Sequence, residues 1–192
     1  MWRLTRPWSW LFVVLVLASG CGGGSPTSSP TSPSRPMFLD CEIPTIGAMT
    51  ATLDGTPWIP VSTRAYHGSG ISLQASDCRY KLRIDFGRFK GLGTYDVAAG
   101  DVRVYHECDG GTGLDCGLYQ ATATTDGFGK TTVTGSGSLT VTAYTPPTPG
   151  VLGSGAIEGT FSFTMLGPFT MLGVPGARVM ANGRFGSRFY GW

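Results

Sequence analysis

The sequence predicts an all-β domain, either an antiparallel β-sandwich or a barrel-like fold of roughly eight to ten short strands. Several stretches alternate apolar and polar residues, which is the period of a strand with one buried face. No long stretch keeps the helical period of about 3.6 residues, and 30 glycines among 192 residues disfavour helices. The strands are expected within residues 37–192, a length that fits a single domain with its own core.

The clearest strand is predicted at 80–86, where one face is apolar and the other is charged. Its apolar residues are Tyr80, Leu82, Ile84 and Phe86, and its charged residues are Lys81, Arg83 and Asp85. The same alternation at 157–165 predicts a central strand, whose apolar residues are Ile157, Phe161, Phe163 and Met165. Weaker alternation predicts further strands at 48–53, 59–66, 71–75, 102–107, 118–124, 138–143 and 177–185.

Residues that adopt a positive φ easily are expected to form the turns between these strands. They are Asp54-Gly55, Gly68-Ser69-Gly70, Asp126-Gly127 and Asn182-Gly183. The segment Gly127-Phe128-Gly129-Lys130-Thr131 is similar to the end of a phosphate-binding loop, but Thr124 stands where such a loop needs its first glycine. We therefore predict a hairpin turn at this segment.

Residues 1–20 have the order of a secretory signal. Arg3 and Arg6 supply a positive end, and an apolar run at 11–17 follows, which is too short to span a bilayer. Small residues come next and end at a cysteine. The sequence therefore predicts export from the cytoplasm and removal of this segment.

The residues around the expected cleavage point are Leu17, Ala18, Ser19, Gly20 and Cys21. This arrangement resembles the lipobox of bacterial lipoproteins, and the resemblance implies that Cys21 is acylated and anchors the protein to a membrane. An Asp after the cysteine often marks inner-membrane retention in such proteins. Because this chain has Gly at that position, the resemblance implies an extracytoplasmic location at the outer membrane or cell surface. The alternatives are an ordinary cleaved signal with an incidental cysteine, or a buried core segment.

Residues 21–36 are rich in Gly, Ser, Pro and Thr and are expected to form a disordered tether. Loss of Arg3 and Arg6 with the signal would leave 12 basic and 12 acidic residues. A neutral chain is poorly suited to neutralising phosphates, which argues against a nucleic-acid partner. The expected partners are the membrane, through Cys21, and an envelope protein or glycan.

Four cysteines remain in the domain, and an oxidising compartment permits them to form disulfides. Three pairings are possible. We expect Cys108 to pair with Cys116, because they enclose a flexible loop of hairpin size, and Cys41 to pair with Cys78. A zinc site is the alternative, but the chain has no Cys-x-x-Cys pair.

Three carboxylates flank or lie within the loop between Cys108 and Cys116, namely Glu107, Asp109 and Asp115. Carboxylate oxygens at a restrained turn are calcium ligands of the right type, so these residues are candidate calcium ligands. The spacing is not that of an EF-hand, and calcium takes six to eight oxygens. The alternative is a solvated acidic loop. The sequence implies no other metal and no cofactor.

His67 and His106 are the only histidines, and the chain lacks both a His-Glu-x-x-His motif and a Gly-x-Ser-x-Gly motif. Each is therefore expected to be an ordinary surface or strand histidine. The sequence favours a non-catalytic binding or structural module, with an extracytoplasmic hydrolase of unrecognised active site as the alternative. The terminal aromatics Phe189, Tyr190 and Trp192 are expected to pack over an open end of the domain, with contact to a partner as the alternative.

Several landmarks of the domain resemble those of a family of bacterial lipoprotein domains of unknown function. They are Thr50-Ala51-Thr52-Leu53-Asp54-Gly55-Thr56-Pro57-Trp58, Gly93-Thr94-Tyr95, Gly159-Thr160-Phe161-Ser162-Phe163-Thr164 and Asn182-Gly183-Arg184-Phe185. They occur in the order that the family shows. The resemblance implies a β fold and assigns no catalytic residue.

Overall fold

The computed structural model describes residues 47–77, 79–108, 117–169 and 175–190. These residues form twelve strands and contain no helix, which confirms the all-β prediction. The strand number exceeds the predicted eight to ten, because β2, β6 and β9 are too short to show alternation in the sequence. The strands belong to one compact unit.

The strands differ widely in length, and β11 and β12 have 14 residues each. The first six are β1 (Gly47–Leu53), β2 (Thr56–Trp58), β3 (Ser62–His67), β4 (Ile71–Ser76), β5 (Tyr80–Phe86) and β6 (Gly93–Asp96). The other six are β7 (Val102–Cys108), β8 (Tyr119–Thr125), β9 (Thr131–Thr134), β10 (Ser136–Thr145), β11 (Ala156–Phe169) and β12 (Pro175–Arg188).

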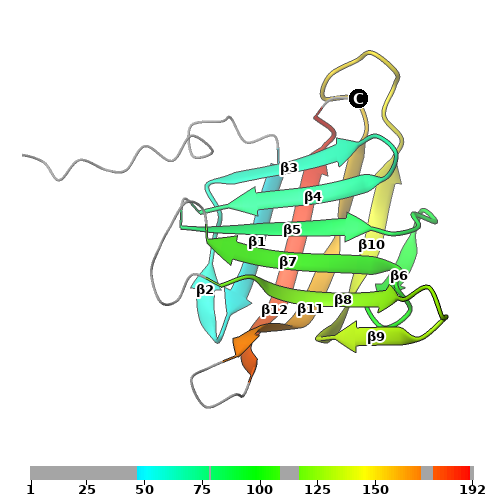
Figure 1. The fold of residues 1–192 in the computed structure, drawn as a ribbon. Helices are drawn as coiled ribbons and strands as arrows, with labels where there is room; N and C mark the ends of the chain where they lie inside the picture. Colours follow the sequence, from blue (N-terminus) through cyan, green and yellow to red (C-terminus); the bar gives the residue numbers. More distant parts are fainter. Residues whose placement is uncertain (1–46, 78, 109–116, 170–174, 191–192) are drawn as a thin grey trace, which may run out of the picture. The chain divides into compact units, whose positions relative to one another are not determined.

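All twelve strands belong to one curled sheet with antiparallel ladders, in the order β2-β1-β12-β11-β8-β7-β5-β4-β3. In addition, β10 joins β11 to β6, and β9 pairs with β8. The long strand β11 changes partner along its length: residues from Ala156 to Thr164 pair with β10, whereas Leu166 pairs with Gln120 of β8. Figure 1 shows β3, β4, β5, β7, β8 and β9 crossing over β1, β10, β11 and β12. The two sets of strands therefore enclose the core between them.

The core follows the predicted alternation. Leu82 and Ile84 of β5 are completely buried, and so are their neighbours Leu73 of β4 and Val104 of β7. On the other side of the core, β11 and β12 contribute buried side chains that include Phe161, Phe163, Met165, Met180 and Phe185. Each such side chain contributes about 1.5–3 kcal/mol when it is removed from water. The prediction of a central strand at 157–165 is confirmed, because β11 has neighbours on both sides.

Three of the four predicted turns are present. Asp54 and Gly55 join β1 to β2 with φ values of 51° and 81°. Residues 68–70 join β3 to β4, and the β8–β9 hairpin turns at residues 126–130. There the Asp126 carboxylate accepts hydrogen bonds from the backbone N–H groups of Phe128 and Lys130, at 2.9 Å each. This segment is therefore the predicted hairpin turn and not a phosphate-binding loop.

The predicted turn at Asn182-Gly183 is wrong, because both residues lie inside β12. Asn182 has a φ of 53°, and the ladders on either side shift register at this point. These features are those of a β-bulge, which uses the same left-handed conformation as a turn without ending the strand. Gly183 is needed at this bulge because the ring of Phe161 occupies the place of a Cβ atom.

Candidate ligand-binding groove

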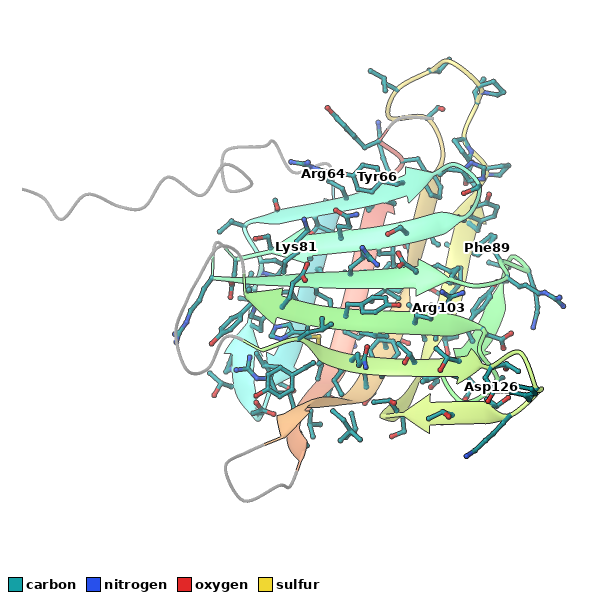
Figure 2. All side chains as sticks on the ribbon, viewed as in Figure 1. Arg64, Tyr66, Lys81, Phe89, Arg103 and Asp126 are labelled. Carbon is teal, nitrogen blue, oxygen red and sulfur yellow. The ribbon has the colours of Figure 1, made fainter. Side chains whose placement is uncertain are left out.

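An open groove of about 630 Å³ lies at the turn between β3 and β4. Its walls come from β3, β4, β5, the start of β7 and the end of the chain. The side chains that line it are Tyr66, His67, Ser69, Ile71, Ser72, Asp85, Phe86, Arg103 and Tyr190. Figure 2 labels Tyr66 on β3 and Arg103 on β7, at the two sides of this region.

Strand register places the polar residues of the groove next to one another. Tyr66 pairs with Ser72, Ser72 with Asp85, and Asp85 with Arg103, so these four residues form one row across four strands. Neighbouring positions alternate in direction, and the residues beside this row, such as Ile84 and Val104, are buried in the core. The row therefore lies on the outer face of the sheet.

The two charged side chains of the groove, Asp85 and Arg103, differ in their surroundings. Asp85 forms an ion pair with Arg83 at 3.0 Å, and Arg83 also lies over the ring of Tyr105 at 4.7 Å. Arg103 is exposed. The Ser72 hydroxyl oxygen is buried and has no hydrogen-bond partner among the described residues. The groove thus contains an exposed cation and a buried hydroxyl that no described group satisfies.

Aromatic rings line the side of the groove next to the chain end. The rings of Tyr66 and Tyr190 meet edge to face at 6.1 Å, and those of His67 and Phe189 do so at 5.6 Å. The Tyr190 backbone N–H donates to the Ala65 carbonyl at 2.7 Å, which fixes the chain end against β3. Phe189 is buried, whereas the Tyr190 residue is 44% exposed. Trp192 lies outside the described residues.

A serine, a histidine and an aspartate all line this groove, which is the set that a hydrolase would need. His67 is adjacent to Tyr66 on β3 and pairs with buried Ile71, so it belongs to the inner face, whereas Ser72 and Asp85 belong to the outer face. The Ser72 hydroxyl makes no hydrogen bond to His67, since it has no partner among the described residues. The three residues share a groove but do not form a triad.

The other histidine lies in the core, where the sequence suggested only an ordinary strand position. His106 is completely buried, and its two ring nitrogens have no hydrogen-bond partner in the described part of the chain. Its ring stacks on Tyr80 at 5.1 Å and meets Trp58 edge to face at 6.4 Å. Burial, and then the positive charge of Arg178, lower the pKa of His106 from 6.5 to about 4.

Most of the predicted site residues lie outside the described residues, namely Cys21, Cys41, Cys78, Asp109, Asp115 and Cys116. Cys108 is the last residue of β7. Glu107 is exposed and pairs in register with Lys81 of β5. Within the described ranges, no three His, Cys, Asp or Glu residues lie close enough together to hold a metal ion. The calcium site, both disulfides and the lipid anchor therefore stay predictions.

No family model, curated protein or solved structure matches this chain. The described residues include no helix that is long and apolar enough to cross a membrane. The fold and the groove thus define the protein as an all-β domain with an open polar and aromatic groove.

Proposed function

We propose that this chain is a bacterial envelope lipoprotein, anchored through Cys21, whose domain is a non-catalytic module that binds glycans. The order of signal, lipobox-like residues and tether in the sequence supports the anchor and the placement at the outer membrane or cell surface. The resemblance of the domain's landmarks to lipoprotein domains of unknown function supports the same assignment. The groove at the β3–β4 turn is the observation that favours glycan binding.

A sugar ring has apolar C–H faces and a rim of hydroxyl groups. The groove offers a matching set of groups: the tyrosine rings of Tyr66 and Tyr190, and the hydrogen-bonding side chains of Ser72, Asp85 and Arg103. Side chains of this kind fix the orientation of a ligand in a largely preformed site. The open form of the groove fits an internal segment of a chain better than an enclosed small molecule.

We expect the full chain, purified in detergent, to bind glycans on an array of neutral and acidic oligosaccharides. The Arg103→Ala variant should bind the best of these about tenfold more weakly, because it removes charge-assisted hydrogen bonds in the groove. The matched control is Lys130→Ala, which removes an exposed cation from the β8–β9 turn. Binding to no glycan, or equal losses in the two variants, would contradict the proposed function.

The same groove supports a hydrolase as the second candidate, because it contains His67, Ser72 and Asp85. Ligand binding would have to bring the Ser72 hydroxyl and the His67 ring to hydrogen-bond distance for the serine to be activated. Hydrolysis of an acyl ester on a bound glycan, abolished by Ser72→Ala, would replace the binding module with this candidate, because an activated serine attacks an acyl carbonyl and water then releases the acid.

The anchor has its own test. In cells grown with a fatty-acid analogue, the wild-type chain should be labelled and found in the membrane fraction, because the diacylglyceryl group on the Cys21 sulfur provides the attachment. The Cys21→Ser variant should be neither labelled nor retained. Equal labelling of the two chains would show that Cys21 is not the acylated residue.

A further inference from the structure

A second, smaller cavity of about 50 Å³ lies on the same outer face, over β3, β4 and the start of β5. Its polar lining comes from Ser62, Arg64, Tyr66, Gln74, Ser76 and Lys81. Tyr66 lines both this cavity and the groove, so the two adjoin at its ring. Figure 2 shows Arg64 beside Tyr66 on β3 and Lys81 on β5.

Register explains why two cations share this cavity. Arg64 pairs with Gln74, and Ser76 pairs both with Ser62 on one side and with Lys81 on the other. All of these residues lie on the outer pleat, because the positions between them, such as Ala75 and Leu82, belong to the core. The two serines are nevertheless buried. Among the residues that the structure describes, no carboxylate lines the cavity. The lining is therefore positively charged and rich in hydrogen-bond donors.

The guanidinium of Arg64 is held in place but only partly satisfied. Its Nη1 donates to the Tyr66 hydroxyl at 3.4 Å, and its Cζ lies 5.5 Å from the centre of the Tyr190 ring. Its Nε and Nη2 are buried and have no hydrogen-bond partner among the described residues. Leaving a buried donor unsatisfied costs about 1–3 kcal/mol, and more for a charged group.

Nε and Nη2 of Arg64 lie on the same edge of the guanidinium group. The N–H bonds of Nε and Nη2 point the same way from one edge of the planar guanidinium, and this edge binds both oxygens of a carboxylate in two parallel hydrogen bonds. A cavity of about 50 Å³ has room for one such group and no more. Lys81 adds a second positive charge on the opposite wall.

We propose that this cavity binds one carboxylate of an acidic sugar whose neighbouring units lie in the groove. The inference rests on the proposed glycan-binding function and names its ligand class as an acidic glycan. The carboxylate takes the free edge of Arg64, with Lys81, Gln74 and the two serines around it. The Tyr190 ring lies against the guanidinium and its residue is exposed, so a change of the Tyr190 rotamer would uncover the buried nitrogens.

The test compares a galacturonic acid trimer with a galactose trimer by calorimetric titration of the full chain in detergent. The two ligands differ only in their carboxylates. The wild-type chain should bind the acidic trimer at least about tenfold more tightly. The Arg64→Gln variant should lose this preference and keep its affinity for the neutral trimer, and Arg64→Lys should recover little of it, because an ammonium cannot form the two parallel bonds.

The matched control is Lys130→Gln, which removes the same charge from an exposed position in the β8–β9 turn. It should keep the preference for the acidic trimer. A wild-type chain that binds both trimers equally, or an Arg64→Gln variant that keeps the preference, overturns the acidic-ligand inference and leaves glycan binding intact. Failure of the wild-type chain to bind either trimer also overturns the acidic-ligand inference, and the proposed function falls with it only if no glycan of the array binds.

A second measurement uses sodium acetate in place of sodium chloride at equal ionic strength. Acetate should raise the Tm of the wild-type chain and of Lys130→Gln, because it binds the folded state. It should not raise the Tm of Arg64→Gln, whose Tm in chloride also shows whether the variant folds. Equal rises in all three chains would mean that acetate acts elsewhere and would overturn the site.

Discussion

The Gly137→Ala variant is expected to lose about 3 kcal/mol or more of its free energy of unfolding. Gly137 lies in β10 with a φ of 129°, a conformation that costs a residue with a Cβ atom about 1–3 kcal/mol. The added Cβ would also meet the Ser162 carbonyl oxygen and, at 2.7 Å, the Phe163 Cα of β11. These are backbone atoms, so relief requires a shift of the ladder, and such overpacking costs about 1–3 kcal/mol.

Two glycines serve as controls for this prediction. Gly55→Ala has a positive φ of 81° but would meet no atom within 4 Å, so it isolates the conformational cost. Gly68→Ala has neither a positive φ nor a near atom and should be close to neutral. Urea unfolding of the three variants should rank Gly137→Ala as the least stable and Gly68→Ala as the most stable. A Gly137→Ala midpoint equal to that of Gly55→Ala would show that β10 and β11 separate without cost.

Local patterns were enough to predict the long amphipathic strands. At 80–86, the alternation of apolar and charged residues placed Leu82 and Ile84 in the core and Lys81 and Arg83 outside it, as the structure shows. The Asn182-Gly183 pair misled the prediction because one backbone conformation serves both turns and bulges. Only the pairing of β12 with β1 and β11 tells them apart, and that pairing joins distant segments.

The candidate sites were harder to predict, since they depend on register. Arg64 and Lys81 are 17 positions apart, and they share a cavity because β4 lies between their strands with Ser76 opposite Lys81. Tyr190 is 126 positions from Arg64 in the sequence, and the two meet because the Tyr190 backbone binds β3 at Ala65. The sequence predicted that Tyr190 packs over an open end of the domain or contacts a partner. It did not predict a role for Arg64, because a charged residue in a strand is usually solvent-exposed.

Acid is expected to destabilise the fold through His106, by about 3 kcal/mol between pH 7 and pH 4. The pKa of His106 falls from 6.5 to about 4 on folding, so the buried ring stays neutral while the unfolded ring takes up a proton. The unfolded state therefore binds more protons in this range, and stability falls as the pH drops below about 6.5. Below about 4 both states are protonated and this loss levels off. Each unit of pKa difference corresponds to about 1.4 kcal/mol.

The charged groups near His106 shift its pKa in both directions. Arg178 lowers its pKa, whereas Asp77 and Asp54 raise it, and the uncharged rings of Tyr80 and Trp58 cover its faces. Burial is the largest cause, so removing Arg178 alone should leave most of the acid sensitivity in place. The expected loss of stability in acid is therefore caused mainly by the burial of the imidazole ring.

The His106→Phe variant tests this expectation, because it keeps an aromatic ring against Tyr80 and removes the titrating group. Its free energy of unfolding should fall about 3 kcal/mol less than that of the wild-type chain between pH 7 and pH 4, as measured by urea unfolding at several pH values. His67→Phe is the matched control, since it removes the chain's other histidine from a half-buried position in the groove. If His106→Phe loses as much stability in acid as the wild-type chain, the carboxylates and not His106 set the acid limit of the fold.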